Sequence, residues 1–359
     1  MRFSFLASIL LLLAAVVRAT EPAALPEKID ALVPVLMAKH HVPGVAVVGL
    51  AHRTIAFERY YGVRTAGKTA PIDAYTVFEA ASMSKPPAAY VALKLVEQGK
   101  LDLDRPLHEY LDHPYLTDTP LHLKITARMV LSHTTGFPNW RAGGWLAGGP
   151  LPVNFEPGSK FGYSGEGFTY LQHVLEHITD EPFERYVQRT LLKPAGITRS
   201  SYVWNDDIAK FAAAGHTAKG NVPASRELFR RSNPAYSLYC TPRDYALFLV
   251  ELLKPDRTTP HSLSARSLAT MLTRTTQIDG APPPARPSGP PPEPAYYGLG
   301  WAIERSASGD RIRHSGSNGT GFRCYCEWYP ATGSGIVIMT NAVGGAALWR
   351  ELLAAVGEP

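Results

Sequence analysis

The sequence is poor in cysteine and in clustered charge, and each shortage excludes a class of protein. Three cysteines among 359 residues are too few for a disulfide scaffold or a four-cysteine zinc site. The net charge is +5 and the lysines and arginines form no cluster, so we expect no nucleic-acid partner. Hydrophobic residues still make up 45% of the chain, which is enough to bury a core.

Several common functional motifs are also missing. No G-x-G-x-x-G sequence or phosphate-binding loop occurs, so no nucleotide is expected. No G-x-S-x-G sequence occurs, which argues against an α/β-hydrolase. Our principal hypothesis therefore uses no cofactor and no metal ion.

The N-terminus has the composition of a secretory signal. Arg2 gives a positive start, and Phe3 to Val17 is an apolar run that is short for a membrane-spanning helix. Val17 and Ala19 suit positions −3 and −1 of a cleavage site, so we expect residues 1–19 to be a signal peptide. An uncleaved membrane anchor is the alternative. The expected location is the periplasm or the outside of the cell, with no membrane contact beyond export.

Export would permit disulfide bonds. Cys324 and Cys326 are two residues apart on an expected strand, a spacing that is poor for bridging each other. A bond from Cys240 to one of them and three buried unpaired thiols are both compatible with the sequence.

Hydrophobic periodicity divides the chain into strands at both ends and helices between them. The first part predicts a helix at Leu25 to His40, a strand at Val45 to Leu50 and a hairpin partner at Ile55 to Tyr61. The helices expected in the middle are Ala88 to Gly99, Ile125 to Leu131, Phe168 to Ile178, Phe183 to Leu192 and Arg243 to Leu253. The last part predicts strands at Gly298 to Ile303, Ile312 to Ser315, Phe322 to Trp328 and Gly335 to Thr340, then a helix at Ala346 to Val356.

These elements predict an α/β protein of the α+β type. An antiparallel sheet from both chain ends would be flanked by helices, with a helical subdomain inserted. One domain would span residues 28–355, with a sheet part (28–75 and 295–355) and a mostly helical part (76–280). Residues 281–294 hold eight prolines and should form an exposed loop. We expect a functional site in the groove between the two parts.

Ser82 and Lys85 form an S-x-x-K sequence at the start of the helix expected from Ala88. On a helix, residues i and i+3 share one face and can touch. A serine hydroxyl needs a base to become a nucleophile, and a lysine serves as that base if desolvation lowers its pKa. A helix start also offers N–H groups to a developing negative charge. Taken alone the motif is weak, because a capping serine beside a solvated lysine is common.

Two further segments carry compatible groups. Tyr163 ends a loop that leads into the next helix, and a tyrosine held near a lysine can hold or relay a proton. His314, Ser315, Gly316 and Ser317 stand at the end of an expected strand. A donor side chain, a hydroxyl and a glycine that lets a ligand approach the backbone would suit an acyl substrate.

In this order the three segments resemble the serine β-lactamase and penicillin-binding-protein superfamily, whose motifs are S-x-x-K, Y-x-N and K-T-G. The most similar branch holds class C β-lactamases, D-specific peptidases and related esterases. The resemblance covers about residues 28–355 and extends to three further stretches: Leu95 to Leu103, Leu131 to Gly136 and Tyr297 to Trp301.

The resemblance implies a mechanism and a substrate class. Ser82 would form an acyl-enzyme, with Lys85 and Tyr163 sharing the base and acid work. The backbone N–H groups of Ser82 and Ser317 would form the oxyanion hole, and His314 and Ser315 would hold the carboxylate or acyl side of the substrate. The substrate would be a small molecule or a peptide: an ester, a β-lactam or a D-amino-acid amide. The oligomeric state stays open.

Two departures from the family pattern affect this interpretation. Gly165 stands where the family usually has asparagine, and His314 stands where many β-lactamases have lysine. Histidine is only partly charged near neutral pH, so carboxylate recognition should be weaker or pH-dependent. Both departures favour an esterase or a D-amino-acid peptidase over a dedicated β-lactamase.

Two alternatives belong to other functional classes. One is a catalytically weak penicillin-binding sensor or scaffold, which Gly165 makes possible. The other is a zinc peptidase, because His173, Glu176 and His177 match H-x-x-E-H, with Glu251 as a conceivable third ligand. Against zinc, this segment stands where the serine family has a plain amphipathic helix.

Overall fold

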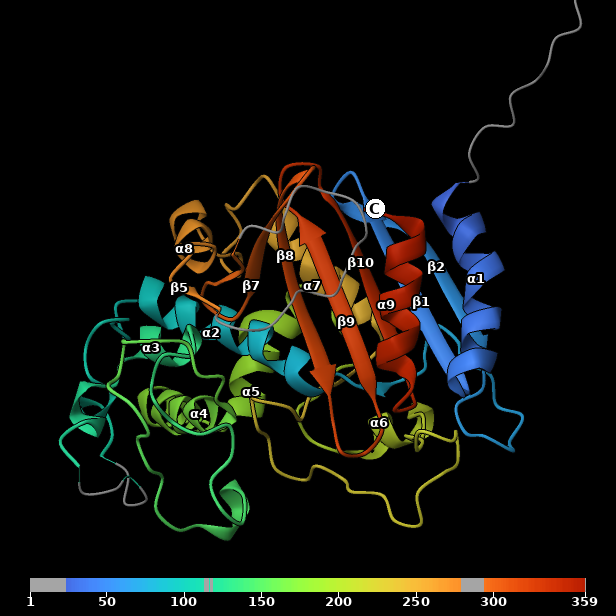
Figure 1. Ribbon diagram of the computed structural model, residues 1–359. Helices are drawn as coiled ribbons and strands as arrows, with labels where there is room; N and C mark the ends of the chain where they lie inside the picture. The colour runs from blue at the N-terminus through green and yellow to red at the C-terminus, as the bar shows by residue number, and fades with distance from the viewer. Residues whose placement is uncertain (1–23, 113–115, 117–118, 279–293, 359) are drawn as a thin grey trace, which may run out of the picture.

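An eight-stranded antiparallel sheet joins the two ends of the chain. In the computed structural model (Figure 1), which describes residues 24–112, 116, 119–278 and 294–358, the strand order is β2-β1-β10-β9-β8-β7-β6-β5. The strands are β1 (Gly44–Ala51), β2 (Thr54–Gly62), β5 (Thr276–Gln277), β6 (Tyr296–Tyr297), β7 (Ala302–Ser306), β8 (Gly309–Ser317), β9 (Arg323–Tyr329) and β10 (Ser334–Thr340). A separate pair is formed by β3 (Phe78–Glu79) and β4 (Tyr239–Cys240).

Helices from both chain ends cover one face of this sheet. Figure 1 shows α1 (Leu25–His40) and α9 (Gly345–Val356) lying side by side on that face. Val45 and Val47 of β1 pack toward them, because alternate residues of a strand point to the same side. Ala46 and Val48 point to the other face, so β1 is apolar throughout.

The inserted helices cover the opposite face, where α7 (Pro242–Leu253) packs on β1 and β10. In α2 (Lys85–Glu97) every residue from Lys85 to Leu95 is buried, because α2 runs through the middle of the protein. The other helices are α3 (Ala127–Leu131), α4 (Gly165–Thr179), α5 (Phe183–Val187), α6 (Asp206–Phe211) and α8 (Ala265–Met271). Short turns are the 3₁₀ segments Ala81–Ser84, Leu107–Glu109, His122–Lys124 and Trp145–Ala147, and a π-helical segment Gln188–Leu192 that continues α5.

The predicted fold class is confirmed, and the differences are local. The strand expected at Gly298 to Ile303 was wrong in its first four residues, because β6 ends at Tyr297 and β7 begins only at Ala302. Between them Gly300 has φ +84°, and a Cβ there would lie 2.7 Å from the Cβ of Ala89. The chain therefore turns at this glycine to pack closely on α2. The short elements α6, α8, β3, β4 and β5 were not predicted, because so few residues show no clear period.

The structure also bears on the thiols and the termini. Cys240, Cys324 and Cys326 are all buried and unpaired. No helix in the described part of the chain is long and apolar enough to cross a membrane. The expected signal peptide (residues 1–19) lies outside the described residues, as does the proline-rich loop apart from its last residue.

Candidate active site

Ser82 sits in a tight 3₁₀ turn that β8 presses against. Ala81, the residue before it, has φ +51°, a left-handed conformation that costs on the order of 1–3 kcal/mol for a residue other than glycine. A Cβ at Gly316 would lie 2.1 Å from the carbonyl oxygen of Ala80. Gly316 therefore lets β8 approach the turn that holds Ser82. The approach permitted by this glycine is that of the protein's own backbone rather than that of a ligand.

Lys85 is buried beside Ser82 without a carboxylate to balance its charge. Its Nζ lies 3.4 Å from Ser82 Oγ and donates a hydrogen bond to the carbonyl oxygen of Ala235 at 2.8 Å. Only 1% of Lys85 is exposed, and among the described residues no acidic side chain forms an ion pair with it. Burial lowers the pKa of Lys85 well below its usual value. The neutral amine, which can accept a proton, is therefore favoured.

Tyr163 completes the group around the serine. Its ring centre lies 4.6 Å from Lys85 Nζ. Burial raises the pKa of Tyr163 above its usual value, and a hydrogen bond with Ser82 opposes that shift. The phenol is therefore protonated in the resting protein. The structure brings Ser82, Lys85 and Tyr163 together.

His133 fixes the segment that carries Tyr163. Its Nδ1 accepts a hydrogen bond from the backbone N–H of Ser164 at 3.0 Å, and its ring centre lies 4.1 Å from that of Tyr163. Burial is the main reason that the pKa of His133 lies well below the usual value, so the ring is neutral. The structure therefore gives His133 a local hydrogen-bonding role.

His314 is also close to Lys85, but both of its ring nitrogens have partners. Nδ1 donates to the carbonyl oxygen of Ser315 at 2.8 Å, and Nε2 accepts from the hydroxyl of Tyr297 at 3.0 Å. Burial, with a smaller effect from the charge of Lys85, lowers the pKa of His314 to about 3. The ring is therefore neutral at physiological pH and offers no cation to a carboxylate.

Ser315 and Ser317 lie on the other side of β8 from His314. Ser315 pairs with Tyr325, which stacks on Trp349 of α9, whereas His314 pairs with Cys326 in the core around α2. Because paired residues share one face of a sheet, the side chain of Ser315 belongs to the α9 face.

The backbone of β8 has a free edge next to Ser82. The pairing of β7 with β8 ends at Ala302 and Arg313, while β9 continues to pair up to Ser317. In the described chain, residues 314–317 therefore have a strand on one side only. Alternate backbone groups of an antiparallel strand point to each side, so this edge offers hydrogen-bonding groups to a bound molecule. Ser317 lines a cavity together with Ser82.

That cavity, which we call the catalytic cavity, has a volume of about 260 Å³. Its lining contains one carboxylate and no lysine or arginine. The lining residues are Ser82, Asn139, Trp140, Gly144, Trp145, Glu227, Phe229, Tyr236, Ser317, Asn318, Gly319 and Thr320. Phe229 and Tyr236 belong to no motif that points to a site, so their place in the cavity could not be predicted from the sequence.

Trp140 occupies the space that a side chain at position 165 would need. A Cβ on Gly165 would lie 2.5 Å from the Trp140 ring. The backbone N–H of Gly165 is bound by Asn139 Oδ1 at 3.0 Å. The Trp140 indole thus fills the space beside Gly165. It presents an apolar surface where the family usually has the amide of an asparagine.

Glu79 holds the turn that follows β8. Its Oε2 accepts hydrogen bonds from Asn318 Nδ2 at 3.1 Å and from Thr320 Oγ1 at 2.5 Å, while the buried Oε1 has no hydrogen-bond partner in the described structure. Burial raises the pKa of Glu79 above its usual value. Since Asn318 and Thr320 both line the catalytic cavity, Glu79 positions one of its walls. Nothing in the sequence pattern indicated this residue.

The residues of the zinc alternative have other partners. Glu176 Oε1 accepts hydrogen bonds from Gln172 Nε2 and from the backbone N–H of Phe183, both at 2.9 Å. Glu251, the conceivable third ligand, bonds Tyr90 and Ser262 instead. Among the residues that the structure describes, no three histidine, cysteine or acidic side chains gather as a metal site.

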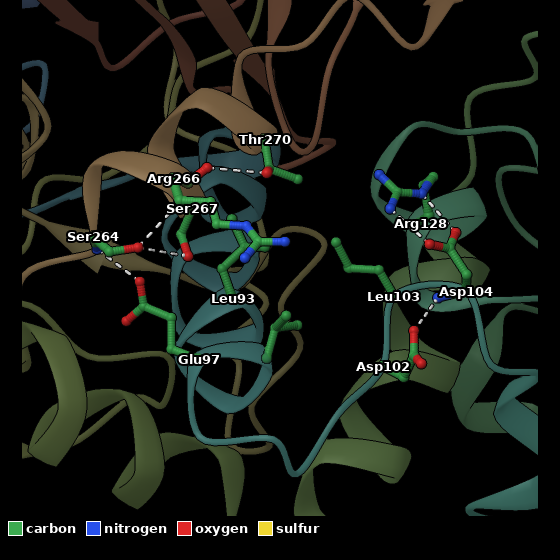
Figure 2. Close-up of a pocket in the computed structure, with 11 residues that line it drawn as sticks. Leu93, Glu97, Asp102, Leu103, Asp104, Arg128, Ser264, Arg266, Ser267 and Thr270 are labelled. Carbon is green, nitrogen blue, oxygen red and sulfur yellow. Dashed lines mark hydrogen bonds and ion pairs between the residues drawn. The ribbon is translucent and has the colours of Figure 1, made fainter.

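A second cavity is larger and lies between α2, α8 and residues 102–104 (Figure 2). Its volume is about 690 Å³, and we call it the α2–α8 cavity. Arg128 binds Asp104 through two hydrogen bonds of 2.6 and 2.8 Å, and Glu97 accepts from Lys94 and from the backbone N–H of Ser264, both at 2.6 Å. None of the predicted site residues lines this cavity.

Known proteins share both sequence and fold with this chain. The Beta-lactamase family model matches residues 29–358. Protein flp of Staphylococcus aureus is 24% identical over 246 residues, which are 64% of this chain and 47% of that protein. Esterase EstB of Burkholderia gladioli is 27% identical over 224 residues, which are 55% of this chain and 56% of that protein. The chain thus spans about half the length of the curated relatives it matches.

Solved structures match nearly the whole chain. The D-alanine carboxypeptidase AmpC from Burkholderia cenocepacia has a TM-score of 0.74 at 20% identity, covering 92% of this chain and 99% of that one. A class C beta-lactamase mutant has a TM-score of 0.73 at 19% identity, covering 92% and 97%. At these identities the likeness establishes the fold. Since the family model spans almost all of the chain, this protein belongs to the beta-lactamase family.

Proposed function

We propose that this protein is an exported serine hydrolase that works through an acyl-enzyme on Ser82. The observation that carries the proposal is the buried amine of Lys85, 3.4 Å from Ser82 Oγ and without a counterion among the residues that the structure describes. Membership of the beta-lactamase family supports a serine hydrolase of this type. The substrate is an ester, a β-lactam or a D-amino-acid amide, and the site favours an uncharged ester.

In the first half-reaction Lys85 acts as the base. Its neutral amine takes the proton from Ser82 Oγ, and the oxygen attacks the carbonyl carbon of the substrate. The backbone N–H groups of Ser82 and Ser317 receive the negative charge that develops on the carbonyl oxygen. Removal of one such donor typically costs roughly 3–4 kcal/mol of barrier. The Lys85 ammonium then passes a proton through the Tyr163 phenol to the leaving alcohol or amine.

In the second half-reaction water replaces the leaving group. Lys85, neutral again, accepts a proton from the water through Tyr163, and the hydroxide attacks the acyl carbon. Collapse of the intermediate returns the proton to Ser82 Oγ and releases the acid. His314 takes no part in these proton transfers, because its two ring nitrogens bind the hydroxyl of Tyr297 and the carbonyl oxygen of Ser315.

The charge of the catalytic cavity supports an uncharged ester over an anionic substrate. Among its lining residues Glu227 is the charged one, and it is acidic. Penicillins and peptides with a free C-terminus carry a carboxylate that would need a cation, and His314 is neutral. The similarity to a protein named esterase EstB is consistent with this preference.

Intact-mass analysis tests the proposal. Wild-type protein and Ser82→Ala are each mixed with an activated acetate ester and, separately, with a penicillin. We expect transient acylation and turnover of the ester by wild type alone. A stable penicilloyl adduct without ester hydrolysis would instead identify the penicillin-binding sensor or scaffold. Acylation of Ser82→Ala at the same rate as wild type would refute the assignment of the nucleophile.

Export remains part of the proposal and rests on residues 1–19. Expression of the full chain in a bacterial host, followed by mass analysis of the periplasmic fraction, tests it. We expect a mature protein that begins at Thr20. Recovery of the uncleaved chain from the membrane fraction would favour the anchor, and recovery of it from the cytoplasm would contradict export.

A further inference from the structure

A third cavity, separate from the α2–α8 cavity, adjoins the catalytic cavity and shares four of its lining residues. It has a volume of about 370 Å³ and adds Leu146, Leu228, Arg230 and Arg231 to the shared residues Trp145, Glu227, Phe229 and Tyr236. We call it the distal cavity. Because Trp145 and Tyr236 line both cavities, they stand between them.

These two side chains are joined across the boundary. Trp145 Nε1 donates a hydrogen bond to the Tyr236 hydroxyl at 2.8 Å. The Tyr236 ring is held by edge contacts with Trp140 and Phe229, whose ring centres lie 5.4 and 4.9 Å away. Tyr236 is therefore a fixed member of the pair.

Trp145 stands on a segment with little packing around it. The 3₁₀ turn Trp145–Ala147 is flanked by Gly144 and Gly148, and a Cβ at either glycine would meet nothing within 4 Å. Leu146, next to Trp145, is 58% exposed. A side chain on such a segment can move at small cost.

The base of this segment is anchored, so movement is confined to its tip. Arg141 donates to the carbonyl oxygen of Gly149 at 3.0 Å and forms a buried ion pair with Glu166 at 2.5 Å. The two ends of the loop are thus tied together and to α4. The tip that carries Trp145 extends from this anchor to Tyr236.

We propose that the hydrogen-bonded pair of Trp145 and Tyr236 sets the length of the substrate chain that the enzyme accepts. With the pair in place, the substrate is an ester whose alkyl chain is short enough for the catalytic cavity. Without it, the two cavities join, and Leu146 and Leu228 extend the apolar surface for a longer chain. This inference rests on the proposed esterase function and deepens it by naming short-chain, uncharged esters as the substrate class.

The test measures kcat/KM over two series of esters. One series varies the acyl chain from two to ten carbons on a constant p-nitrophenol, and the other varies a straight-chain alcohol on a constant acetyl group. The two series distinguish whether the acyl half or the alcohol half of the ester occupies the cavity. Wild type should prefer the shortest members of at least one series.

Trp145→Ala should raise the ratio of kcat/KM for the eight-carbon ester to that for the four-carbon ester by about tenfold or more, because methylenes gain an apolar surface. Tyr236→Phe keeps the ring and removes the bond acceptor, so it should shift the ratio in the same direction by a smaller factor. Leu123→Ala, an exposed leucine that lines neither cavity, is the control and should leave the ratio unchanged.

An unchanged ratio in both series for both variants would overturn the inference. The proposed function would survive that result if wild type still forms an acetyl adduct on Ser82. Conversely, if no ester acylates Ser82 in wild type, the proposed function fails first. Thermal unfolding of each variant shows whether a lost activity reflects lost folding, and Tyr236→Phe keeps the test decisive if Trp145→Ala does not fold.

Discussion

The α2–α8 cavity and the catalytic cavity differ both in size and in the chemistry of the groups around them. The α2–α8 cavity is the larger, at about 690 Å³ against about 260 Å³ for the catalytic cavity. In the larger one Arg128 is bound by Asp104, and Glu97 is bound by Lys94. Beside the smaller one Lys85 is buried without a counterion, and Ala81 has a strained backbone. Volume alone would have selected the region that holds none of the site residues predicted from the sequence.

Comparison of the two cavities shows which structural features help to recognise a functional site. Paired charges lower the free energy of the fold and need no other explanation, whereas a buried amine without a counterion raises it. Such arrangements persist where the perturbed group serves a reaction. Three experiments set a residue of the catalytic site against a counterpart beside the α2–α8 cavity, and a fourth varies the pH.

Replacement of the nucleophile should have the largest effect. Ser82→Ala should lower kcat for an activated ester by at least about 10³-fold, because the reaction loses its covalent path. The matched change, Ser264→Ala, removes the cap of α8 and should cost about 1 kcal/mol of unfolding free energy with kcat unchanged. Ester hydrolysis and urea unfolding measure the two outcomes. Loss of kcat in Ser264→Ala would link the α2–α8 cavity to catalysis.

Two lysines on α2 provide the second comparison. Lys85→Met should reduce kcat by roughly 10²–10⁴-fold, and it should leave stability equal or higher, because an uncompensated buried amine is removed. Lys94→Met should instead reduce stability, since Lys94 binds Glu97 and the carbonyl oxygen of Ser262. Equal kcat for Lys85→Met and wild type would reject Lys85 as the base.

The pH dependence follows from the pKa shifts at the catalytic site. Because the neutral amine of Lys85 is the active form, kcat/KM should rise with pH through its lowered pKa and level off below pH 10.5. His314, with a pKa of about 3, should add no inflection between pH 5 and 9. A pH profile of kcat/KM that inflects at the usual lysine pKa would contradict the buried neutral amine.

The same shift predicts a slope in stability. The folded pKa of Lys85 lies below the unfolded value of 10.5, so the unfolded chain binds more protons between those two pKa values. The free energy of unfolding should therefore increase as pH rises through that interval, because of Lys85. Lys85→Met should remove this contribution, which urea unfolding at several pH values can detect.

The smallest of the four effects should come from Glu79. Glu79→Ala frees Asn318 and Thr320, so kcat should fall by about tenfold while KM changes less, because the turn beside the oxyanion donor loses its anchor. Glu79→Gln retains an acceptor and should restore most of the loss. Glu97→Ala at the α2–α8 cavity should lower stability without lowering kcat. If Glu79→Ala and Glu97→Ala lowered kcat equally and stability equally, Glu79 would act on the fold alone.

Contacts within one turn or one strand could be predicted from the sequence. The spacing of Ser82 and Lys85 predicted their proximity, and the apolar period predicted α1 with the bounds that the structure shows. The resemblance supplied the roles of Tyr163 and of the last residues of β8. Hydrophobic periodicity describes only the local conformation of the chain. It therefore predicts contacts best between residues that are close in sequence.

Contacts between segments that are far apart in the chain could not be predicted from the sequence. The carbonyl of Ala235 binds Lys85 across 150 positions, and Asn318 binds Glu79 across 239. The neutrality of His314 could not be predicted either, because it depends on burial and on the hydroxyl of Tyr297. Gly316 was correctly predicted to permit a close approach. Only the structure shows that the group approaching it is the backbone of Ala80.

The joining of the two chain ends in one sheet determines when the protein can act. Ser317 follows Ser82 by more than two hundred residues, and β1 pairs directly with β10. A growing chain therefore contains Ser82 and Lys85 long before it contains Ser317. On the proposed function, the incomplete chain would lack the second oxyanion donor until the last strands are made. A protease that removed those strands would then abolish hydrolysis while leaving Ser82 and Lys85 untouched.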